Sequence, residues 1–415
     1  MTSAAKALFL EGVTAADPAF AVKQALSERP IEATPNGRLL VLAFGKAACA
    51  MMEAALESLP EGQSATAIAV TNYENARDIK GCKVFASGHP LPDQNGLDAG
   101  LYVMEGLERL TANDAVLCLI SGGGSALLPT PRDGLTLADK IAVNEALLSG
   151  GLDIVQMNAV RQQLSILKGG GLLDLAHPAK VRSLVISDVI GDDIRAIASG
   201  PTAQAMGGLD QIIPVLKAKS IWEDLPAAAQ SHLSNPRNIR ERESDNSIIC
   251  SNRQSLTAIQ KIATDWDAHI VSDRLVGDVE QAARDIVDYA LSHPVKSGDL
   301  QLLIWGGETT VNLRGTGKGG RNQELCLHVA SLAQDLPEAW VFLSGGTDGR
   351  DGPTDAAGGI VDSATLQRAR SKGVNVEDAL SNNDSYRILQ AAGNLLLTKA
   401  TGTNVADIQL LLRMG

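Results

Sequence analysis

The sequence predicts an α/β fold, because short apolar runs rich in β-branched residues alternate along the chain with longer helical patterns. The short runs are apolar over nearly their whole length, which is typical of strands buried on both faces of a parallel sheet. Strands that alternate with helices in this way predict layered sheets with helices on both faces. The 415 residues are enough for about two to three domains of ordinary size.

The pattern predicts the following elements in chain order. Strands are expected at Leu39–Phe44, Ala67–Thr71, Lys83–Ala86, Ala115–Ile120, Ser183–Ser187, Ser247–Ser251, His269–Ser272, Leu300–Trp305, Val311–Arg314 and Trp340–Ser344. Helices are expected between them, including Lys46–Leu59, Asp98–Leu110, Leu137–Ser149, Ile154–Lys168, Ser255–Asp265 and Asp278–Ser292.

A polar, charged segment with two prolines divides this series. Residues 226–245 read PAAAQSHLSNPRNIRERESD, which is typical of a linker. We therefore expect one domain at residues 1–235 and a second at residues 245–415. The alternative is a surface excursion within one large domain.

Composition and charge exclude several classes of protein. Apolar residues make up 45% of the chain and charged residues 20%, which excludes a disordered or fibrous protein. The formal net charge of −12 argues against general attraction to nucleic acid or acidic lipid. No apolar run approaches the ~18 residues of a membrane helix, and no secretory signal is apparent. The five cysteines are scattered without a C-x-x-C pair, so we expect reduced thiols and a cytoplasmic location.

Functional groups follow several of the expected strands. Ligands of open α/β sheets bind beyond the carboxyl ends of the strands, where the strand order reverses. Five strand ends carry glycine, hydroxyl, carboxylate or ammonium groups in place of ordinary turn residues, at residues 45–46, 121–125, 188–193, 306–308 and 345–349. Because the five ends share this character, we expect them to form the rim of one active site.

Three consecutive glycines follow the strand that ends at Ile120. In the run from Ser121 to Ser125, the backbone can turn its N–H groups inward without a Cβ clash, and a helix start adds partial positive charge. This combination suits a phosphate; the alternative is a tight turn without a ligand. The chain contains neither a Walker A loop nor a G-x-G-x-x-G dinucleotide fingerprint, and residues 315–320 lack the Walker spacing.

Basic side chains are expected at the same edge. Lys46 directly follows a buried strand, which places its ammonium at the carboxyl edge; the alternative is an ordinary surface lysine. A polar stripe at helical spacing then precedes three glycines that end the helix. The stripe consists of Asn158, Arg161, Ser165 and Lys168. We expect it to face an anion, and a solvated helix face is the alternative.

Carboxylates also follow an expected strand. Asp188, Asp192 and Asp193 would suit Mg²⁺ bound jointly with nucleotide phosphates, and an ordinary helix cap is the alternative. Residues 347–355 have alternate carboxylates but lack the final glutamate of a Ca²⁺ loop, which excludes that site. His89 is the only histidine inside a turn-rich motif, and no Ser/His/Asp or Cys/His arrangement is apparent.

A glycine-rich loop at residues 306–320 leads to Arg321, Asn322 and Glu324 on the first turn of a helix. An arginine in this place offers a planar fork for a carboxylate or a phosphate.

These motifs resemble one known family. The strings GGETTV, RGTGKGGRNQEL and SGGTDGRDGPTDAAGG are similar to the carboxy-terminal MOFRL domain of class II glycerate kinases. The strings VLAFGKAA, GHPLPD, LISGGGSALL, NAVRQQLSILKGGGL and SLVISDVIGDDIRAIASGPT are similar to the large domain of that family. The resemblance covers nearly the whole chain.

The resemblance implies a larger amino-terminal Rossmann-like three-layer domain and a smaller carboxy-terminal MOFRL-type α/β domain, with the active site in the cleft. The implied reaction is the ATP-dependent, Mg²⁺-requiring phosphorylation of D-glycerate to 2-phosphoglycerate. Lys46 and Arg321 match the positions that the family is thought to use at its active site. Members have also carried the label hydroxypyruvate reductase.

Phosphoryl transfer mainly needs positioned phosphates and neutralised charge. We expect Lys46 to stabilise the transferred charge, and Arg321 to hold the glycerate carboxylate or the γ-phosphate. Mg²⁺ is expected at Asp188 and Asp192, and the general base is expected to be Asp351 or Asp188. The expected phosphate-binding residues are Ser121, Gly122, Gly123, Gly124, Ser125, Lys168, Gly169 and Gly170. The expected substrate-binding residues are Asn158, Arg161, Glu308, Asn322 and Glu324.

Two other functions stay open at this point. One is an NAD(P)H-dependent hydroxypyruvate reductase, which the missing dinucleotide fingerprint disfavours. The other is a non-catalytic protein that binds a small anion. The partners expected are D-glycerate and ATP, with no nucleic acid and no membrane, and the sequence leaves open whether the chain forms a homodimer.

Overall fold

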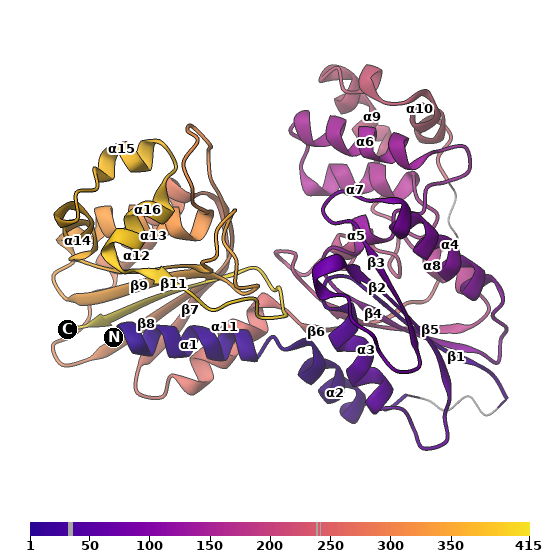
Figure 1. Ribbon diagram of the computed structural model, residues 1–415, viewed down its shortest axis with the longest axis horizontal. Helices are drawn as coiled ribbons and strands as arrows, with labels where there is room; N and C mark the ends of the chain where they lie inside the picture. Colours follow the sequence, from indigo (N-terminus) through magenta and orange to yellow (C-terminus); the bar gives the residue numbers. More distant parts are fainter. Residues whose placement is uncertain (32–35, 238–239, 241) are drawn as a thin grey trace. The chain divides into compact units, whose positions relative to one another are not determined.

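The computed structural model describes all residues except 32–35, 238–239 and 241, and these described residues form two compact units (Figure 1). Residues 18–249 form the parallel-sheet unit. Residues 1–17 and 250–415 form the mixed-sheet unit. The expected linker at residues 226–245 lies partly outside the described residues, and its first part forms the helix α10 (Ala227–Ser234).

The division differs from the predicted domains at residues 245–249, which belong to the parallel-sheet unit and not to the second domain, and at the start of the chain. The helix α1 (Thr2–Thr14) belongs to the mixed-sheet unit, whereas the prediction assigned residues 1–17 to the amino-terminal domain. The reason is its apolar face, because Ala5, Leu8, Phe9 and Val13 are buried in the core of the mixed-sheet unit. The sequence pattern predicts such a face but does not identify its partner.

The parallel-sheet unit contains six strands in the order β3-β2-β1-β4-β5-β6. Their bounds are Leu39–Phe44 (β1), Ala65–Asn72 (β2), Cys82–Ser87 (β3), Ala115–Ile120 (β4), Lys180–Ile186 (β5) and Asp245–Cys250 (β6). The pairs β1–β2, β1–β4, β2–β3 and β4–β5 are parallel, as predicted. This is the strand order of Rossmann folds, which reverses between β1 and β4. The carboxyl ends of β1 and β4 are therefore the expected place for a ligand.

Helices cover both faces of this sheet (Figure 1). The helices against the sheet are α2 (Pro18–Glu28), α3 (Ala48–Glu57), α4 (Gln94–Glu108) and α8 (Gly171–Ala176), with the short α5 (Gly124–Leu127) after β4. A second apolar cluster joins α10 to α6 (Leu137–Ser149), α7 (Ile154–Gln163) and α9 (Leu209–Ala218). Every residue of β1 is buried, as a strand covered on both faces requires.

The mixed-sheet unit has the strand order β11-β10-β9-β12-β8-β7. Its strands are Asp267–Asp278 (β7), Leu300–Thr310 (β8), Ala339–Gly346 (β9), Gly358–Asp362 (β10), Leu395–Leu396 (β11) and Asp407–Met414 (β12). Only β7 and β8 pair in parallel among the described strands of this sheet; β12 is antiparallel to both β8 and β9. The expectation of a parallel sheet is wrong here, because β12 lies antiparallel between β8 and β9, and β10 is antiparallel to β9 and β11.

The strand expected at Val311–Arg314 is also wrong. β8 ends at Thr310, and the following residues form a loop without regular structure. The N–H groups of Arg314 and Gly315 donate to Asn383 Oδ1, so a side chain takes the place of a neighbouring strand.

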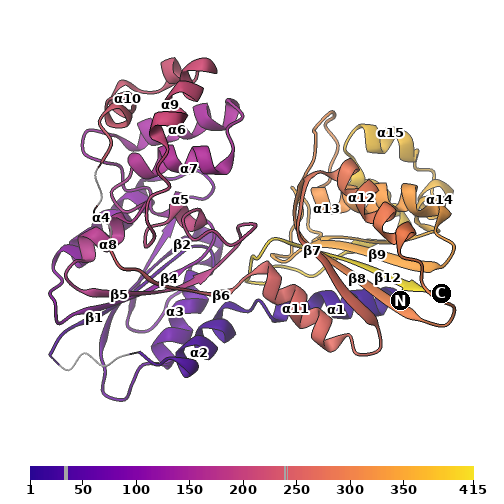
Figure 2. The same cartoon turned by 180° about the vertical axis from the view of Figure 1, so that it is seen from behind.

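Two helical layers cover the mixed sheet (Figure 2). α1 and α11 (Asn252–Ile262) pack on one face. The other face carries α12 (Val279–Ser292), α13 (Arg321–Leu332), α14 (Thr365–Ser371), α15 (Val376–Ser381) and α16 (Ser385–Ala392). Side chains of β12 alternate between these layers, with Leu410 on the α1 side and Leu411 on the other. Within the described chain, no helix is both long and apolar enough to cross a membrane.

Removing the Phe9 ring tests the place of α1. Phe9 is fully buried against the mixed sheet, so Phe9→Ala should lower the free energy of unfolding by about 3–5 kcal/mol. Urea unfolding can be followed by tryptophan fluorescence, because Trp266, Trp305 and Trp340 lie in the mixed-sheet unit and Trp222 in the other. The control is Phe20→Ala, whose ring is 61% exposed. Equal losses from the two variants would contradict the assignment of α1.

Candidate functional site

The turns after β1 and β4 are joined at the point where the strand order reverses. The Lys46 N–H donates to the Gly122 carbonyl over 2.9 Å, and the Ala47 N–H donates to Ser121 Oγ over 3.1 Å. A Cβ at Gly45 would lie 2.1 Å from Ser121 Oγ, so only glycine allows this approach. The Ser121 hydroxyl is therefore a link between the two turns and is almost fully buried. Contact of this hydroxyl with a phosphate stays a prediction.

Three ionisable side chains lie next to Gly122 and Gly123. A Cβ at Gly122 would lie 1.9 Å from Asp188 Oδ2. A Cβ at Gly123 would lie 3.2 Å from both Lys46 Cγ and His89 Nε2, and the residue has a φ of 86°. The two glycines thus leave the space that Lys46, His89 and Asp188 occupy. The structure brings together Lys46, the glycine turn and Asp188, as predicted, and adds His89.

The Lys46 ammonium makes no ion pair and no hydrogen bond among the described residues. Its charge nevertheless acts on its neighbours Asp188 and His89. Burial raises the pKa of Asp188, while its own backbone N–H and the Lys46 ammonium act in the opposite direction. An unpaired cation beside a buried carboxylate can bind a ligand that carries both an anion and a cation.

The other two carboxylates after β5 differ from each other. Asp193 is paired with Arg195 over 2.7 Å, which makes it an ordinary surface ion pair. Asp192 lies in the left-handed region, with a φ of 57°. Within the described part of the chain, no three His, Cys, Asp or Glu side chains form a group that could hold a metal ion alone.

Lys168 takes part in a buried hydrogen-bond chain. Its Nζ donates to the Ser125 carbonyl over 2.7 Å and to Ser125 Oγ over 2.9 Å. Ser125 Oγ lies 2.9 Å from Ser199 Oγ, which donates to Asn158 Oδ1. Because the Ser199 hydroxyl donates its proton to Asn158, the hydrogen bonds run in one direction, from Lys168 through Ser125 and Ser199 to Asn158. The structure thus joins three predicted site residues, but through contacts that hold the loop after β4.

The predicted helix face is wrong in its second half. α7 ends at Gln163, so Lys168 lies beyond the helix that carries Asn158 and Arg161. The N–H groups of Gly169 and Gly170 donate to the Ser199 and Gly200 carbonyls. These two backbone amides donate their hydrogen bonds within the fold, so a bound phosphate would have to be contacted by other groups.

A cation that the sequence reasoning missed lies between α6 and α7. Lys140 Nζ donates to the Leu164 carbonyl over 3.4 Å, and Arg161 contacts Asn144, one turn after Lys140. Burial, and then the charge of Arg161, lowers the pKa of Lys140 to about 7. Burial also lowers the pKa of Lys168, with Lys140 and Arg161 adding to it. The spacing of Lys140 and Asn144 on one helix face was the available clue.

In the mixed-sheet unit, Arg321 begins α13, as predicted. Its Nε and Nη2 donate to Asp407 over 2.6 and 2.9 Å, and its Nη1 lies 2.7 Å from Glu308. Burial alone would lower the pKa of Arg321, but Asp407 and Glu308 raise it above its ordinary value. The planar fork is therefore held by Asp407, which sequence reasoning missed because β12 was not predicted. About a third of the Arg321 side chain remains exposed, with two N–H bonds free of these contacts.

The Asp351 carboxylate caps the start of α13, the helix that begins at Arg321. Its carboxylate accepts hydrogen bonds from the N–H groups of Asn322 and Gln323 and from both of their side chains. Burial raises the pKa of Asp351 to about 6, and these donors oppose the rise. Asn322 is fully buried and accepts from Ser344. The structure therefore gives Asp351 and Asn322 contacts inside the protein.

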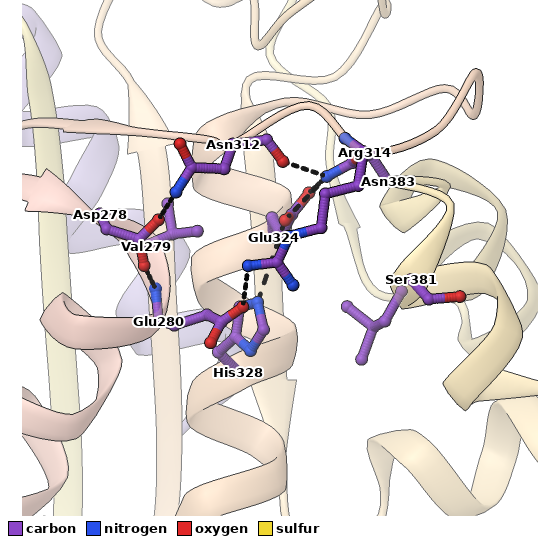
Figure 3. Close-up of a pocket in the computed structure, with 10 residues that line it drawn as sticks. Asp278, Val279, Glu280, Asn312, Arg314, Glu324, His328, Ser381 and Asn383 are labelled. Carbon is purple, nitrogen blue, oxygen red and sulfur yellow. Dashed lines mark hydrogen bonds and ion pairs between the residues drawn. The ribbon is translucent and has the colours of Figure 1, made fainter.

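Glu324 lines a separate small cavity of about 140 Å³ (Figure 3). Asn383 Nδ2 donates to both of its carboxylate oxygens, and His328 Nε2 lies 3.9 Å from Oε1. Asn383 Oδ1 also holds the loop after β8, so Asn383 ties this loop to α13. Glu324 thus supports Asn383 and lies apart from the contacts of Arg321 with Asp407 and Glu308.

The glycines of this loop make room for residues 382–385. A Cβ at Gly315 would lie 2.2 Å from Asn382 Oδ1, and one at Gly319 would lie 2.0 Å from Ser385 Oγ. The N–H groups of Thr316 and Lys318 donate to Asn382 and Asp384. The glycine-rich run is therefore bound by the protein itself.

Comparisons with known proteins agree with this architecture. A family model described as a domain of unknown function (DUF4147) matches residues 4–234, and a model of the MOFRL family matches residues 301–407. A glycerate 2-kinase of Pyrococcus horikoshii is 37% identical, over 96% of this chain and 94% of the relative. A D-glycerate 2-kinase of Thermotoga maritima is also 37% identical, over 96% and 95%.

A solved structure has the same fold. The crystal structure of a glycerate kinase from Thermotoga maritima has a TM-score of 0.90 and 34% identity, and covers 100% of this chain and 99% of that one. The protein is thus of the two-domain α/β class with a MOFRL domain. The chain belongs to the family of the glycerate 2-kinases, as the motifs predicted.

A double-mutant cycle tests how much the ion pair between Arg321 and Asp407 stabilises the fold. Arg321→Met leaves the buried Asp407 carboxylate unpaired and should cost about 3 kcal/mol of unfolding free energy. Arg321→Met combined with Asp407→Asn should recover roughly half of that loss, because a neutral amide is easier to bury than a charge. The Asp407→Asn single variant completes the cycle, and urea unfolding followed by the fluorescence of Trp305 and Trp340 measures all three variants. Additive losses would show that the pair contributes nothing.

Proposed function

We propose that this protein is a kinase that transfers the γ-phosphate of ATP to the 2-hydroxyl of D-glycerate, with Mg²⁺. The observation that carries the proposal is the unpaired Lys46 ammonium beside Asp188 at the carboxyl ends of β1 and β4. Phosphoryl transfer requires mainly positioning and charge neutralisation, and these groups supply both. The glycerate 2-kinase relatives support the choice of substrate.

The residues around the turn fit a Mg²⁺–nucleotide complex. Mg²⁺ is usually held in proteins by one or two carboxylates together with substrate phosphates. Gly122 leaves the space that the Asp188 carboxylate occupies, and Asp192 follows four residues later. We assign the metal to Asp188 and Asp192; when bound, it would neutralise charge on the β- and γ-phosphates.

The other roles follow from the contacts. Lys46 would bind the transferred phosphoryl group, and residues 121–125 would form the wall of the phosphate site. Lys168 and Asn158 would hold that wall in shape through Ser125 and Ser199.

Arg161, with Lys140, would attract an anion. Arg321 would hold the glycerate carboxylate with its remaining N–H bonds, while Asp407 and Glu308 fix its orientation.

The reductase alternative is disfavoured by the turn after β1. In a Rossmann order the dinucleotide pyrophosphate approaches the first turn, where glycines admit it. Here that turn reads Gly45-Lys46-Ala47-Ala48, so a lysine and two alanines stand where the dinucleotide fingerprint needs glycines. The groups present suit a phosphoryl group better than a nicotinamide cofactor.

Purified protein should release ADP in a coupled assay only when D-glycerate, ATP and Mg²⁺ are all present. Phosphorus NMR of the product should show 2-phosphoglycerate. The same preparation with hydroxypyruvate and NADH or NADPH should show no oxidation of the cofactor. Oxidation without ADP release would assign the reductase, and nucleotide binding without either reaction would assign a binding protein.

Lys46→Met tests the central residue. The change keeps most of the stem that packs on Gly123 and removes the charge, so kcat should fall on the order of 10²–10³-fold with folding unchanged. Lys80→Met, at an exposed site of the same unit, is the matched control and should keep full activity. Near-normal turnover of Lys46→Met would remove Lys46 from the mechanism.

A further inference from the structure

His89 lies at the glycine turn and has no part in the roles assigned so far. It follows β3 in the loop before α4, and its ring lies beside Gly123. A Cβ at Gly123 would lie 3.1 Å from His89 Cδ2 and 3.2 Å from Nε2, and equally close to the Lys46 stem. His89 and Lys46 are therefore neighbours across a glycine that a larger residue cannot replace.

The imidazole is half-buried and has no internal partner. Among the described residues, neither ring nitrogen of His89 has a hydrogen bond or an ion pair. Two charged groups act on it, Lys46 and Glu74. Burial lowers the pKa of His89, Lys46 lowers it further, and Glu74 opposes this. At neutral pH the ring is therefore neutral and can accept a proton.

The proposed reaction needs such a group. The 2-hydroxyl loses its proton as its oxygen bonds to phosphorus, and a positioned side chain can take that proton. The Asp351 carboxylate already accepts hydrogen bonds from the N–H groups at the start of α13. Asp188 is assigned to the metal, where its carboxylate must stay ionised. Of the side chains around Gly122 and Gly123, His89 remains with free acceptor capacity.

We propose that His89 is the proton acceptor of the reaction; this inference rests on the proposed kinase function. As the substrate oxygen bonds to the γ-phosphorus, the O–H bond breaks and its proton passes to a ring nitrogen of His89. The bond between the γ-phosphorus and the bridging oxygen breaks, and ADP leaves with the electron pair. The imidazolium then releases the proton to solvent, which restores the neutral ring.

His89→Gln tests this role by its pH profile. The amide can still hydrogen-bond but cannot accept the proton, so kcat should fall about 10²-fold or more, with a smaller change in KM. Wild-type kcat/KM should fall as pH drops through the His89 pKa, and this acidic limb should be absent in His89→Gln. The control is His177→Gln, an exposed histidine that also precedes a proline. A variant with normal kcat, or with the acidic limb retained, would overturn the proposal.

A second measurement does not depend on turnover. The chain has six histidines, so a ¹³C-labelled ring Cε1–H spectrum can be assigned with His89→Gln. The His89 pKa should lie below its ordinary value and rise in Lys46→Met, because a neighbouring cation is removed. Adding Mg²⁺, ADP and D-glycerate together should shift the His89 resonance but leave that of His177 in place.

The outcomes separate this inference from the proposed function. If wild-type protein releases no ADP with D-glycerate, the kinase assignment fails, while the titration still reports on His89. If ADP is released but the His89 pKa is ordinary and unaffected by Lys46→Met, the role of His89 is overturned and the kinase assignment stands. Loss of activity in His89→Gln together with a normal spectrum of the other histidines excludes a folding defect as its cause.

Discussion

The in-register pairing of β1 with β4 is the constraint on which the site of the parallel-sheet unit depends. Phe44 pairs with Ile120 at the last position of both strands, so the chain leaves the two strands at one level of the sheet. The turns at Lys46 and Gly122 then meet and are joined by backbone and Ser121 contacts. A slip of one residue would move Lys46 by about 3.3 Å and exchange the faces of β1. Both faces of β1 are closely packed, so a slip would force each side chain into the packing of the opposite face.

Glycine has two different uses in this protein. At Gly122 and Gly123, the missing Cβ leaves space for the side chains of Asp188, His89 and Lys46. In the loop after β8, the missing Cβ atoms admit residues 382–385, which bind the loop from within the protein. The two runs look alike as sequence, because composition does not tell what approaches the glycine. Only the structure separates a glycine that makes room for ionisable side chains from one that makes room for a packed loop.

The parts that sequence patterns predicted well are local. The strands of the parallel sheet are continuous apolar runs, and their carboxyl ends were recognisable from Lys46, Ser121 and Asp188. The predictions that failed concern contacts between segments that are distant in the sequence. α1 packs on segments more than 200 residues away in the chain, β12 pairs with strands that come well before it, and the Arg321–Asp407 pair depends on β12. Lys168 was placed on a helix by its spacing, whereas Ser125 and Ser199 draw it into a loop. Ionisable side chains were identified by type, but their partners were not.

The route of the chain through the two units has a consequence for biosynthesis. Residues 18–249 are one continuous segment inserted between α1 and the rest of the mixed-sheet unit. This segment carries β1 to β5 and all of β6 except its last residue. α1 packs on α11, β9 and β12, all of which follow the inserted segment in the chain. The apolar face of α1 can therefore be covered only after the whole inserted segment has been synthesised, which makes the mixed-sheet unit the later of the two to be completed.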